Sequence, residues 1–422
     1  MGCFKTHDRV EIYQVIDLVE VVSQAKRDRN INILEVGCGD LRHLLKLKKV
    51  FKDEDLKLIG FDLSYTERTK TIARKENITL IRSLDEIQED SLDIIFLFHV
   101  LEQVDKPIDF ILSLKQKLCE DGYILISVSN DTRASKLIFR ETWDYPPYRN
   151  YRFSEKTFDF IGRMTNLKIV QLKRYYLSLK NDFCIFAEGV KECIYSLIKR
   201  VKSSINMNSH ELNLTTLRNN GSLSMVIIFR KTNRQKLTRI VVFDFDGTII
   251  KEDSYIEYLQ WISENKPVKI LIKILFLAYR LKFVNNKFFK FITWNITYKR
   301  DYDKKFIEKF INRVNWNKNV MILRSIEAEI ERNSKVYVIS ATPKLIISKF
   351  FELLLPDLYP NVTILGSNPF LPRNTLLVNL RHDNKREILK ILGVDYIDDF
   401  YTNSIEEDEP LSKISKNTYI VS

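Results

Sequence analysis

The chain has 422 residues, a net charge of +12 and 45% hydrophobic residues. This length favours two or three domains, and the hydrophobic fraction is ample for their cores. Five cysteines, an odd number without a CxxC pair, argue against a disulfide framework or a zinc site. The first thirty residues lack the apolar core and cleavage site of a signal peptide, so we expect a cytoplasmic protein.

The amino-terminal half opens with an apolar strand that runs into a glycine turn and a helix start, over Asn32–Leu45. Glycines in such a turn let the backbone approach a ligand closely. A second apolar strand begins at Leu56 and ends in Asp62, 23 residues after Gly39. A carboxylate at this spacing can accept the ribose hydroxyls of a nucleoside cofactor.

Further segments complete the pattern of a doubly wound sheet. A buried strand over Ser91–Phe98 is followed by a short helical turn, and another strand follows the turn at Gly122. Leu167–Leu177 and Ser222–Phe229 are predicted as the last two strands, the latter strongly β-prone. Together these segments resemble the class I S-adenosylmethionine-dependent methyltransferases over roughly residues 1–232.

The resemblance implies that S-adenosylmethionine is the cofactor of this half. NAD is the less favoured alternative because Arg42 occupies the place of the third glycine of GxGxxG. Ser83, or else Asp85, stands where many relatives have an acid near the adenine. His99 is either part of the segment that closes over the sulfonium or a structural imidazole at a strand end. The cofactor-binding residues that the resemblance implies are Glu35, Gly37, Gly39, Asp62, Ser83 and His99.

An aromatic loop with two prolines, Trp143–Phe153, precedes a helix that should begin at Ser154. Loops of this kind cover the methyl acceptor in such enzymes, and aromatic rings suit a flat or sugar-like partner. A rigid surface crossover remains the alternative interpretation of the same residues.

The carboxyl-terminal half contains an apolar strand, Ile240–Phe243, that runs into Asp244 and Asp246. Side chains alternate along a strand, so the two carboxylates should emerge on one side. Two acids so placed repel each other unless a cation or phosphate chemistry uses them. A Gly-Thr turn that contains Thr248 follows directly.

Three more motifs follow in order: Ser340 at the end of an apolar strand, Lys385 at the start of a helical pattern, and an acidic loop over Asp398–Asp408. This ordered set resembles the haloacid dehalogenase-like phosphohydrolases, of the phosphoserine phosphatase-like type with a helical cap. The resemblance covers residues 238–422.

The resemblance implies a two-step reaction through an aspartyl-phosphate. Asp244 would be the nucleophile and Asp246 the general acid and base. The phosphoryl oxygens would be bound by Thr248, Ser340 and Lys385. Mg²⁺, which prefers hard oxygen ligands, would be held by Asp244, the Asp246 carbonyl, Asn403 and Asp408.

One position departs from the family pattern. Asn403 stands where these phosphatases usually have an aspartate, and a neutral amide should weaken the metal site. Asp408, five residues on, becomes the better ligand, with Glu407 and Asp399 as rivals. A phosphatase-like domain that is inactive and serves as a binding module is therefore the alternative.

The positive charge is concentrated in two insertions. Residues 191–239 contain ten basic and two acidic residues, and residues 265–313 contain thirteen basic and three acidic ones. The second insertion includes an apolar segment, Pro267–Val284, crossed by a basic stripe: Lys266, Lys273, Arg280 and Lys287. This segment is too short and too charged to span a bilayer, but it could lie at the inner face of a membrane. Packing as an ordinary cap helix is the favoured interpretation, and nucleic acid is disfavoured as a partner because no binding module accompanies the basic segments.

These patterns predict an α/β protein with two Rossmann-like doubly wound sheets, the second carrying an inserted α-helical cap. The predicted domains are residues 1–232 and 233–422, with the cap at about 253–333. The oligomeric state is not determined by these patterns. The predicted activity is methyl transfer together with hydrolysis of a phosphorylated glycan, lipid-linked intermediate or small metabolite. An RNA methyltransferase whose second domain trims phosphates is a third class of function.

Overall fold

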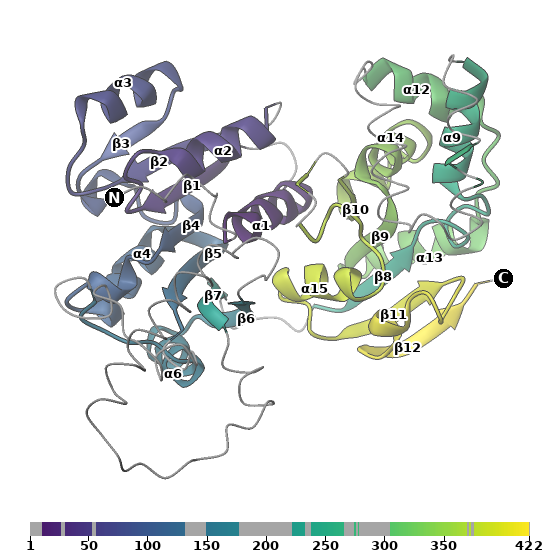
Figure 1. Cartoon of the computed structure of the whole chain (residues 1–422). Helices are drawn as coiled ribbons and strands as arrows, with labels where there is room; N and C mark the ends of the chain where they lie inside the picture. Colours follow the sequence, from purple (N-terminus) through teal and green to yellow (C-terminus); the bar gives the residue numbers. More distant parts are fainter. Residues whose placement is uncertain are drawn as a thin grey trace, which may run out of the picture. The chain divides into compact units, whose positions relative to one another are not determined.

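A computed structural model describes residues 11–26, 30–52, 56–130, 149–176, 222–232, 238–265, 274–275, 277, 304–368, 371–372 and 375–421. The chain divides into two compact units. The first comprises residues 1–12 and 30–233, and the second comprises residues 13–29 and 234–422. Each unit contains one twisted sheet with helices packed against it (Figure 1).

The first unit is built on a seven-stranded sheet of order β3-β2-β1-β4-β5-β7-β6. Its strands are β1 (Ile31–Val36), β2 (Leu56–Phe61), β3 (Thr79–Ile81), β4 (Leu92–Phe98), β5 (Leu118–Ser129), β6 (Lys168–Tyr176) and β7 (Ser222–Arg230). The first five strands are parallel, whereas β7 lies antiparallel between β5 and β6. The strand order reverses between β1 and β4, which creates the crevice where doubly wound sheets bind ligands.

The helices of this unit are α2 (Arg42–Val50), α3 (Glu67–Lys75), α4 (Pro107–Lys117) and α6 (Glu155–Thr165), with short 3₁₀ turns η1 (Leu84–Glu86) and η2 (Leu101–Gln103). Ser154 caps α6 by accepting a hydrogen bond from the Thr157 amide, so the predicted helix start is confirmed. Every residue of β4 is buried, including Asp93, and the apolar run Ile94–Phe98 is typical of a central parallel strand. The two predicted final strands are confirmed as β6 and β7.

The second unit is built on five parallel strands of order β10-β9-β8-β11-β12. The strands are β8 (Ile240–Asp244), β9 (Lys335–Pro343), β10 (Val362–Ser367), β11 (Ile397–Thr402) and β12 (Ser415–Ile420). The helices are α9 (Ser254–Asn265), α12 (Lys304–Arg313), α13 (Val320–Glu331), α14 (Lys344–Leu354), η4 (Tyr359–Asn361), α15 (Asp383–Ile391) and α16 (Glu409–Ser412). Because the order reverses between β8 and β11, the ends of these two strands form the ligand-binding edge.

The predicted fold class is confirmed: both sheets are doubly wound and a helical segment is inserted after β8. Within that insertion α9 and α12 pack through aromatic side chains, with the Trp261 and Phe306 rings 4.4 Å apart. Trp316 packs edge-on against Phe350 of α14, which fastens the insertion to the helix beside β9. Burial of these large rings supplies much of the apolar area that holds the insertion in place.

Helix α1 (Ile12–Ala25) packs as part of the second unit, although it lies near the start of the chain. The sequence boundary at residues 232 and 233 places the same helix in the first domain. The second unit is therefore assembled from two separate stretches of the chain.

Several predicted features fall outside the described residues. They are the loop segment Trp143–Tyr148, residues 191–221, and the apolar segment from Pro267 with its basic stripe, apart from single positions. Among the helices that the structure does describe, none has the length and apolar character that a membrane span requires.

Arg239, directly before β8, contacts two buried acids near the start of the parallel strands. Its guanidinium contacts Glu329 at 3.1 Å and also the carboxylate of Asp399, and both acids are nearly inaccessible to water. Arg239→Met should lower the free energy of unfolding of the second unit by about 2–3 kcal/mol. This is less than the loss at a fully buried pair because the guanidinium is partly hydrated. Urea unfolding measures the loss, and Arg332→Met, which removes an exposed partner of the same Glu329, should cost under about 1 kcal/mol. Equal effects of the two substitutions would contradict this account.

Candidate functional site

The glycine turn after β1 is held open toward a ligand by its backbone. Gly37 and Gly39 both have positive φ, +73° and +50°. A Cβ at Gly37 would lie 2.5 Å from Cγ2 of Val100, whereas one at Gly39 would meet open space. Gly37 is therefore required for packing against the segment after β4, and Gly39 leaves its backbone exposed to a ligand.

Asp62 lies beside this turn. Its carboxylate accepts hydrogen bonds from the Gly39 amide at 2.9 Å and from the Leu63 amide at 2.8 Å. The next side chain, Leu63, is 85% exposed, which leaves an apolar surface beside a half-exposed acid. A sugar hydroxyl and a flat base fit such a pair. Sequence reasoning missed Leu63, since an apolar residue at a strand end gives no signal until its exposure is known.

Ser83 and Glu35, two other residues predicted to bind the cofactor, make contacts elsewhere than at the glycine turn. Ser83 caps η1, accepting from the Asp85 amide and donating its hydroxyl to the Asp85 carboxylate. Glu35 is buried and its carboxylate lies 2.7 Å from Nδ1 of His43, so this acid faces the interior. The structure thus brings Gly37, Gly39 and Asp62 together around the turn.

His99, at positive φ after β4, is placed between two buried acids. Its Nδ1 lies 3.4 Å from Glu102 and its Nε2 lies 3.7 Å from Glu11. Burial opposes ionisation of Glu11, but the contact with His99 and a hydrogen bond from Ser224 bring its pKa down to about 2. Glu11 was missed because it precedes the sheet by twenty residues and belongs to no motif.

Glu102 ties three segments together. Its carboxylate accepts from the Ser129 amide at 2.8 Å and contacts Arg149 at 3.5 Å. Its backbone carbonyl accepts from the amides of Asn150 and Tyr151, near the end of the aromatic loop. Burial opposes the charge, yet His99, the Ser129 amide and Arg149 leave the pKa of Glu102 below its usual value.

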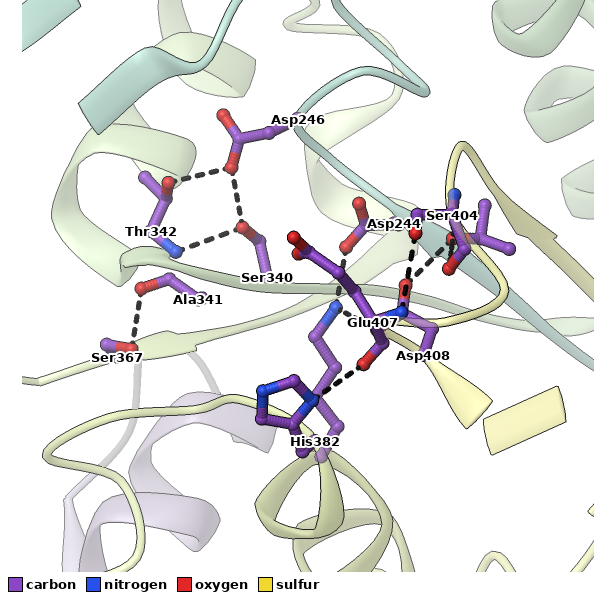
Figure 2. A network of polar contacts seen from close by, with 12 residues as sticks. Asp244, Asp246, Ser340, Ala341, Thr342, Ser367, His382, Ser404, Glu407 and Asp408 are labelled. Carbon is purple, nitrogen blue, oxygen red and sulfur yellow. Dashed lines mark hydrogen bonds and ion pairs between the residues drawn. The ribbon is translucent and has the colours of Figure 1, made fainter. Parts of the chain in front are cut away.

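The second unit gathers its polar residues at the ends of β8, β9 and β11 (Figure 2). Lys385, from α15, donates to Asp244 at 2.8 Å and to Asp408 at 2.7 Å. All three residues are at most 7% exposed. Burial, and the second carboxylate, raise the pKa of Asp244 to about 7 even though Lys385 acts against this. Burial alone would lower the pKa of Lys385, but the two carboxylates raise it, so the ammonium stays charged.

Asp246 points to a separate cluster of hydroxyl groups. Its Oδ2 accepts from Ser340 at 2.8 Å and from Thr342 at 2.7 Å (Figure 2). Its Oδ1 accepts from the amide and the hydroxyl of Ser254. Thr342 and Ser254 were not predicted, because single hydroxyl residues near a strand end or a helix start are common. The Oγ1 of Thr248 is buried without a hydrogen-bond partner among the described residues.

The residues of the acidic loop after β11 differ in their burial and in the contacts that they make. Asp408 has both oxygens engaged, one with Lys385 and the other with the Thr402 hydroxyl at 2.8 Å. Asn403 is exposed and packs against the backbone of Gly247, where a Cβ would lie 2.1 Å from its Nδ2. Glu407 is exposed, and its carbonyl accepts from His382 at the start of α15 (Figure 2).

Asp399 does not reach this group. It pairs in register with Val241, three residues before Asp244 along the parallel strand β8. Its carboxylate instead contacts Arg239 and Asn417. The acid therefore stabilises the opposite end of the sheet.

A magnesium ion at this edge would be bound by three kinds of oxygen: a carboxylate, a backbone carbonyl and a side-chain amide. Within the described residues, no three Asp, Glu, His or Cys side chains lie together as a metal site. Asp244, the Asp246 carbonyl and the Asn403 amide oxygen are hard donors of the kind that Mg²⁺ prefers, with water completing its shell. The donor set fits the ion, with one carboxylate fewer than the usual pattern.

Comparisons with known proteins concern the amino-terminal half. Residues 6–172 match the model of a family described as a methyltransferase domain. A search of curated proteins gives no match. The amino-terminal part of the chain is thus similar to methyltransferase domains over residues 6–172.

Similar solved structures include a SAM-dependent methyltransferase from Archaeoglobus fulgidus, with 16% identity over 52% of this chain and 94% of that one, and a TM-score of 0.33. A putative sarcosine dimethylglycine methyltransferase from Galdieria sulphuraria has 15% identity over 53% and 86% of the two chains, with a TM-score of 0.37. Phosphoethanolamine N-methyltransferase 2 from Haemonchus contortus, in complex with S-adenosyl-L-methionine, has 12% identity over 53% and 57%, with a TM-score of 0.35.

Asp62→Ala tests the cofactor site. If Asp62 accepts from the two ribose hydroxyls, as the resemblance implies, the substitution should lower affinity for S-adenosylmethionine by roughly 1–3 kcal/mol in calorimetry. Asp40→Ala is the matched control, because Asp40 is exposed, adjoins the same turn and directs its carboxylate to the Arg42 guanidinium. Unchanged affinity in Asp62→Ala, or no binding by the unaltered protein, would refute this site.

Proposed function

We propose that the chain is a bifunctional enzyme that joins its methyltransferase domain to a Mg²⁺-dependent phosphomonoesterase in the second unit. The observation that carries the phosphatase proposal is the placement of Asp244. It ends the central strand β8 at the point where the strand order reverses, and it is paired there with buried Lys385. Asp246, two residues after Asp244, accepts a hydrogen bond from Ser340 of β9, and Thr248 lies in the turn that follows.

The proposed reaction has two displacements at phosphorus. In the first, an Asp244 oxygen forms a bond to phosphorus while the ester oxygen departs and takes a proton from Asp246. In the second, water attacks the aspartyl-phosphate, Asp246 takes the proton, and the carboxylate of Asp244 is released with inorganic phosphate. Splitting the hydrolysis in this way replaces one difficult step with two easier ones.

The surrounding side chains have distinct roles in this proposal. Lys385 neutralises charge on the nucleophile and the phosphoryl group, and the unpaired Thr248 hydroxyl donates to a phosphoryl oxygen. Ser340 and Thr342 aim Asp246 by donating to one of its oxygens. Mg²⁺, when bound by Asp244, the Asp246 carbonyl and Asn403, supplies further positive charge at the phosphoryl oxygens.

The methyl acceptor and the phosphate ester are proposed to belong to one pathway because one chain carries both domains. A phosphorylated glycan, lipid-linked intermediate or small metabolite suits that combination. Contact with a membrane surface rests on the segment from Pro267, outside the described residues, and stays an expectation from the sequence.

A second candidate is a phosphatase-like module that binds without turnover. Asn403 favours it, since a neutral amide replaces a carboxylate beside the proposed ion. Hydrolysis of an aryl phosphate, measured with and without Mg²⁺, separates the two candidates.

Asp244→Asn tests the nucleophile. The amide is nearly isosteric with the carboxylate but cannot form an acyl-phosphate, so hydrolysis of an aryl phosphate should fall below a few per cent of the original rate. Methyltransferase cofactor binding, measured on the same preparation, should be unchanged. A larger residual rate, after contaminating phosphatase and deamidation are excluded, would reject Asp244 as nucleophile.

Asn403→Asp tests the metal site. An added negative charge beside Mg²⁺ should lower the metal concentration that gives half-maximal hydrolysis. Asp408→Asn should raise that concentration if Asp408 is a ligand, and should mainly lower the rate if Asp408 only holds Lys385. Should neither variant alter the metal dependence, the assignment of the acidic loop would be wrong.

A further inference from the structure

Helix α1 carries polar side chains that are buried as deeply as its apolar ones. Asp17 is 1% exposed and Gln24 is fully buried. Buried polar groups persist in a fold when they are paired, so the partners of these two side chains indicate what the helix does. Both partners lie more than 340 residues away, within the second unit.

Asp17 binds the segment that precedes α15. Its Oδ1 accepts from the Leu376 amide at 2.7 Å and from the Leu377 amide at 3.3 Å. The carbonyl of Leu376 in turn accepts from the side chain of Asn384 at 3.2 Å. Asn384 lies in the first turn of α15, next to Lys385, whose ammonium contacts Asp244.

Gln24 binds the end of β10. Its side-chain amide donates to the Gly366 carbonyl and accepts from the Gly366 amide, each at 3.2 Å. The adjacent Ser367 donates to the carbonyl of Ala341, which lies between Ser340 and Thr342 (Figure 2). The same Ser367 oxygen accepts from the Leu380 amide, so the end of β10 and the segment before α15 are joined.

From these contacts we propose that Asp17 is a positioning residue for the phosphoryl site, acting through residues 376–377 and Asn384 to place Lys385 against Asp244. Asp17 does not touch the reacting groups. The proposal rests on the proposed phosphatase function, and it extends the catalytic apparatus to a helix near the start of the chain.

The backbone at the start of α15 shows why an outside support is needed. His382, the residue before the helix, has φ +47° and ψ −124°, a conformation that residues other than glycine rarely adopt. Such a conformation persists only where surrounding contacts determine it. The Glu407 carbonyl, bound by His382, supplies one such contact. Asp17 holds residues 376–377, in the segment that leads to His382.

The test uses the full-length chain with p-nitrophenyl phosphate and Mg²⁺. Asp17→Ala should lower kcat about tenfold, an effect expected when a charge that stabilises the transition state is misplaced. Asp17→Asn keeps an oxygen that can accept from both amides and should restore most of the rate. Gln14→Ala is the matched control, because Gln14 lies one turn earlier and is equally buried, but its Oε1 accepts no hydrogen bond from the described residues. It should leave kcat nearly unchanged.

A double-substitution cycle distinguishes positioning from simple loss of folded protein. If Asp17 and Asn384 act in one chain of contacts, Asp17→Ala with Asn384→Ala should lower kcat no more than the stronger single change. Each variant is first shown by circular dichroism to be folded at the assay temperature. If the losses in kcat of the two single variants multiply in the double variant, the role of Asp17 is overturned. It is overturned also if folded Asp17→Ala keeps its kcat, or if Gln14→Ala loses as much. No hydrolysis by the unaltered chain would instead overturn the proposed function, and this role with it.

Discussion

The burial of Lys385 between two carboxylates is the interaction on which the second unit depends. Removing a charge from water is costly, and the cost is met only when partners are close and well oriented. Asp244, Lys385 and Asp408 come from β8, α15 and the loop after β11, so their pairing fixes three separate segments together. With both acids ionised the trio has one negative charge in excess, and burial raises the pKa of Asp244, the proposed nucleophile, to about 7.

The first unit also buries ionisable groups against one another, with different residues. His99 lies between Glu11 and Glu102, and the hydroxyl of Ser224 and the amide of Ser129 satisfy the carboxylate oxygens that they contact. This arrangement holds the ends of β4, β5 and β7 beside the glycine turn. In both units, therefore, buried acids and one nitrogen base organise the sheet edge at which ligands bind in doubly wound folds.

Sequence patterns predicted the parts of the fold that local chemistry determines. Continuous apolar runs indicated the central strands, the serine before α6 indicated a helix start, and the two carboxylates at the end of β8 and just after it indicated a polar strand end. Each of these signals lies within about ten residues, so no knowledge of distant contacts is needed.

Sequence patterns did not predict the role of residues whose partners lie far away in the chain. Asp399 looked like a candidate metal ligand, yet its position in β11 pairs it with Arg239. The polar residues of α1, Gln14, Asp17, Glu20 and Gln24, recur at helical spacing and resemble a solvated face, whereas the structure buries all of them. The spacing of polar residues along a helix cannot by itself distinguish a solvent-exposed face from one that packs against complementary polar groups.

The two-part construction of the second unit has a consequence for how the chain is made. Asp17 leaves the ribosome 359 residues before Leu376, which corresponds to about 20–70 s at roughly 5–20 residues per second. During that interval the helix has none of its distant polar partners, whereas the strands of the intervening domain are all synthesised before it ends. Synthesis therefore imposes an order of completion: the domain encoded in the middle closes first, and the phosphatase-like unit matures only when both of its stretches have been translated.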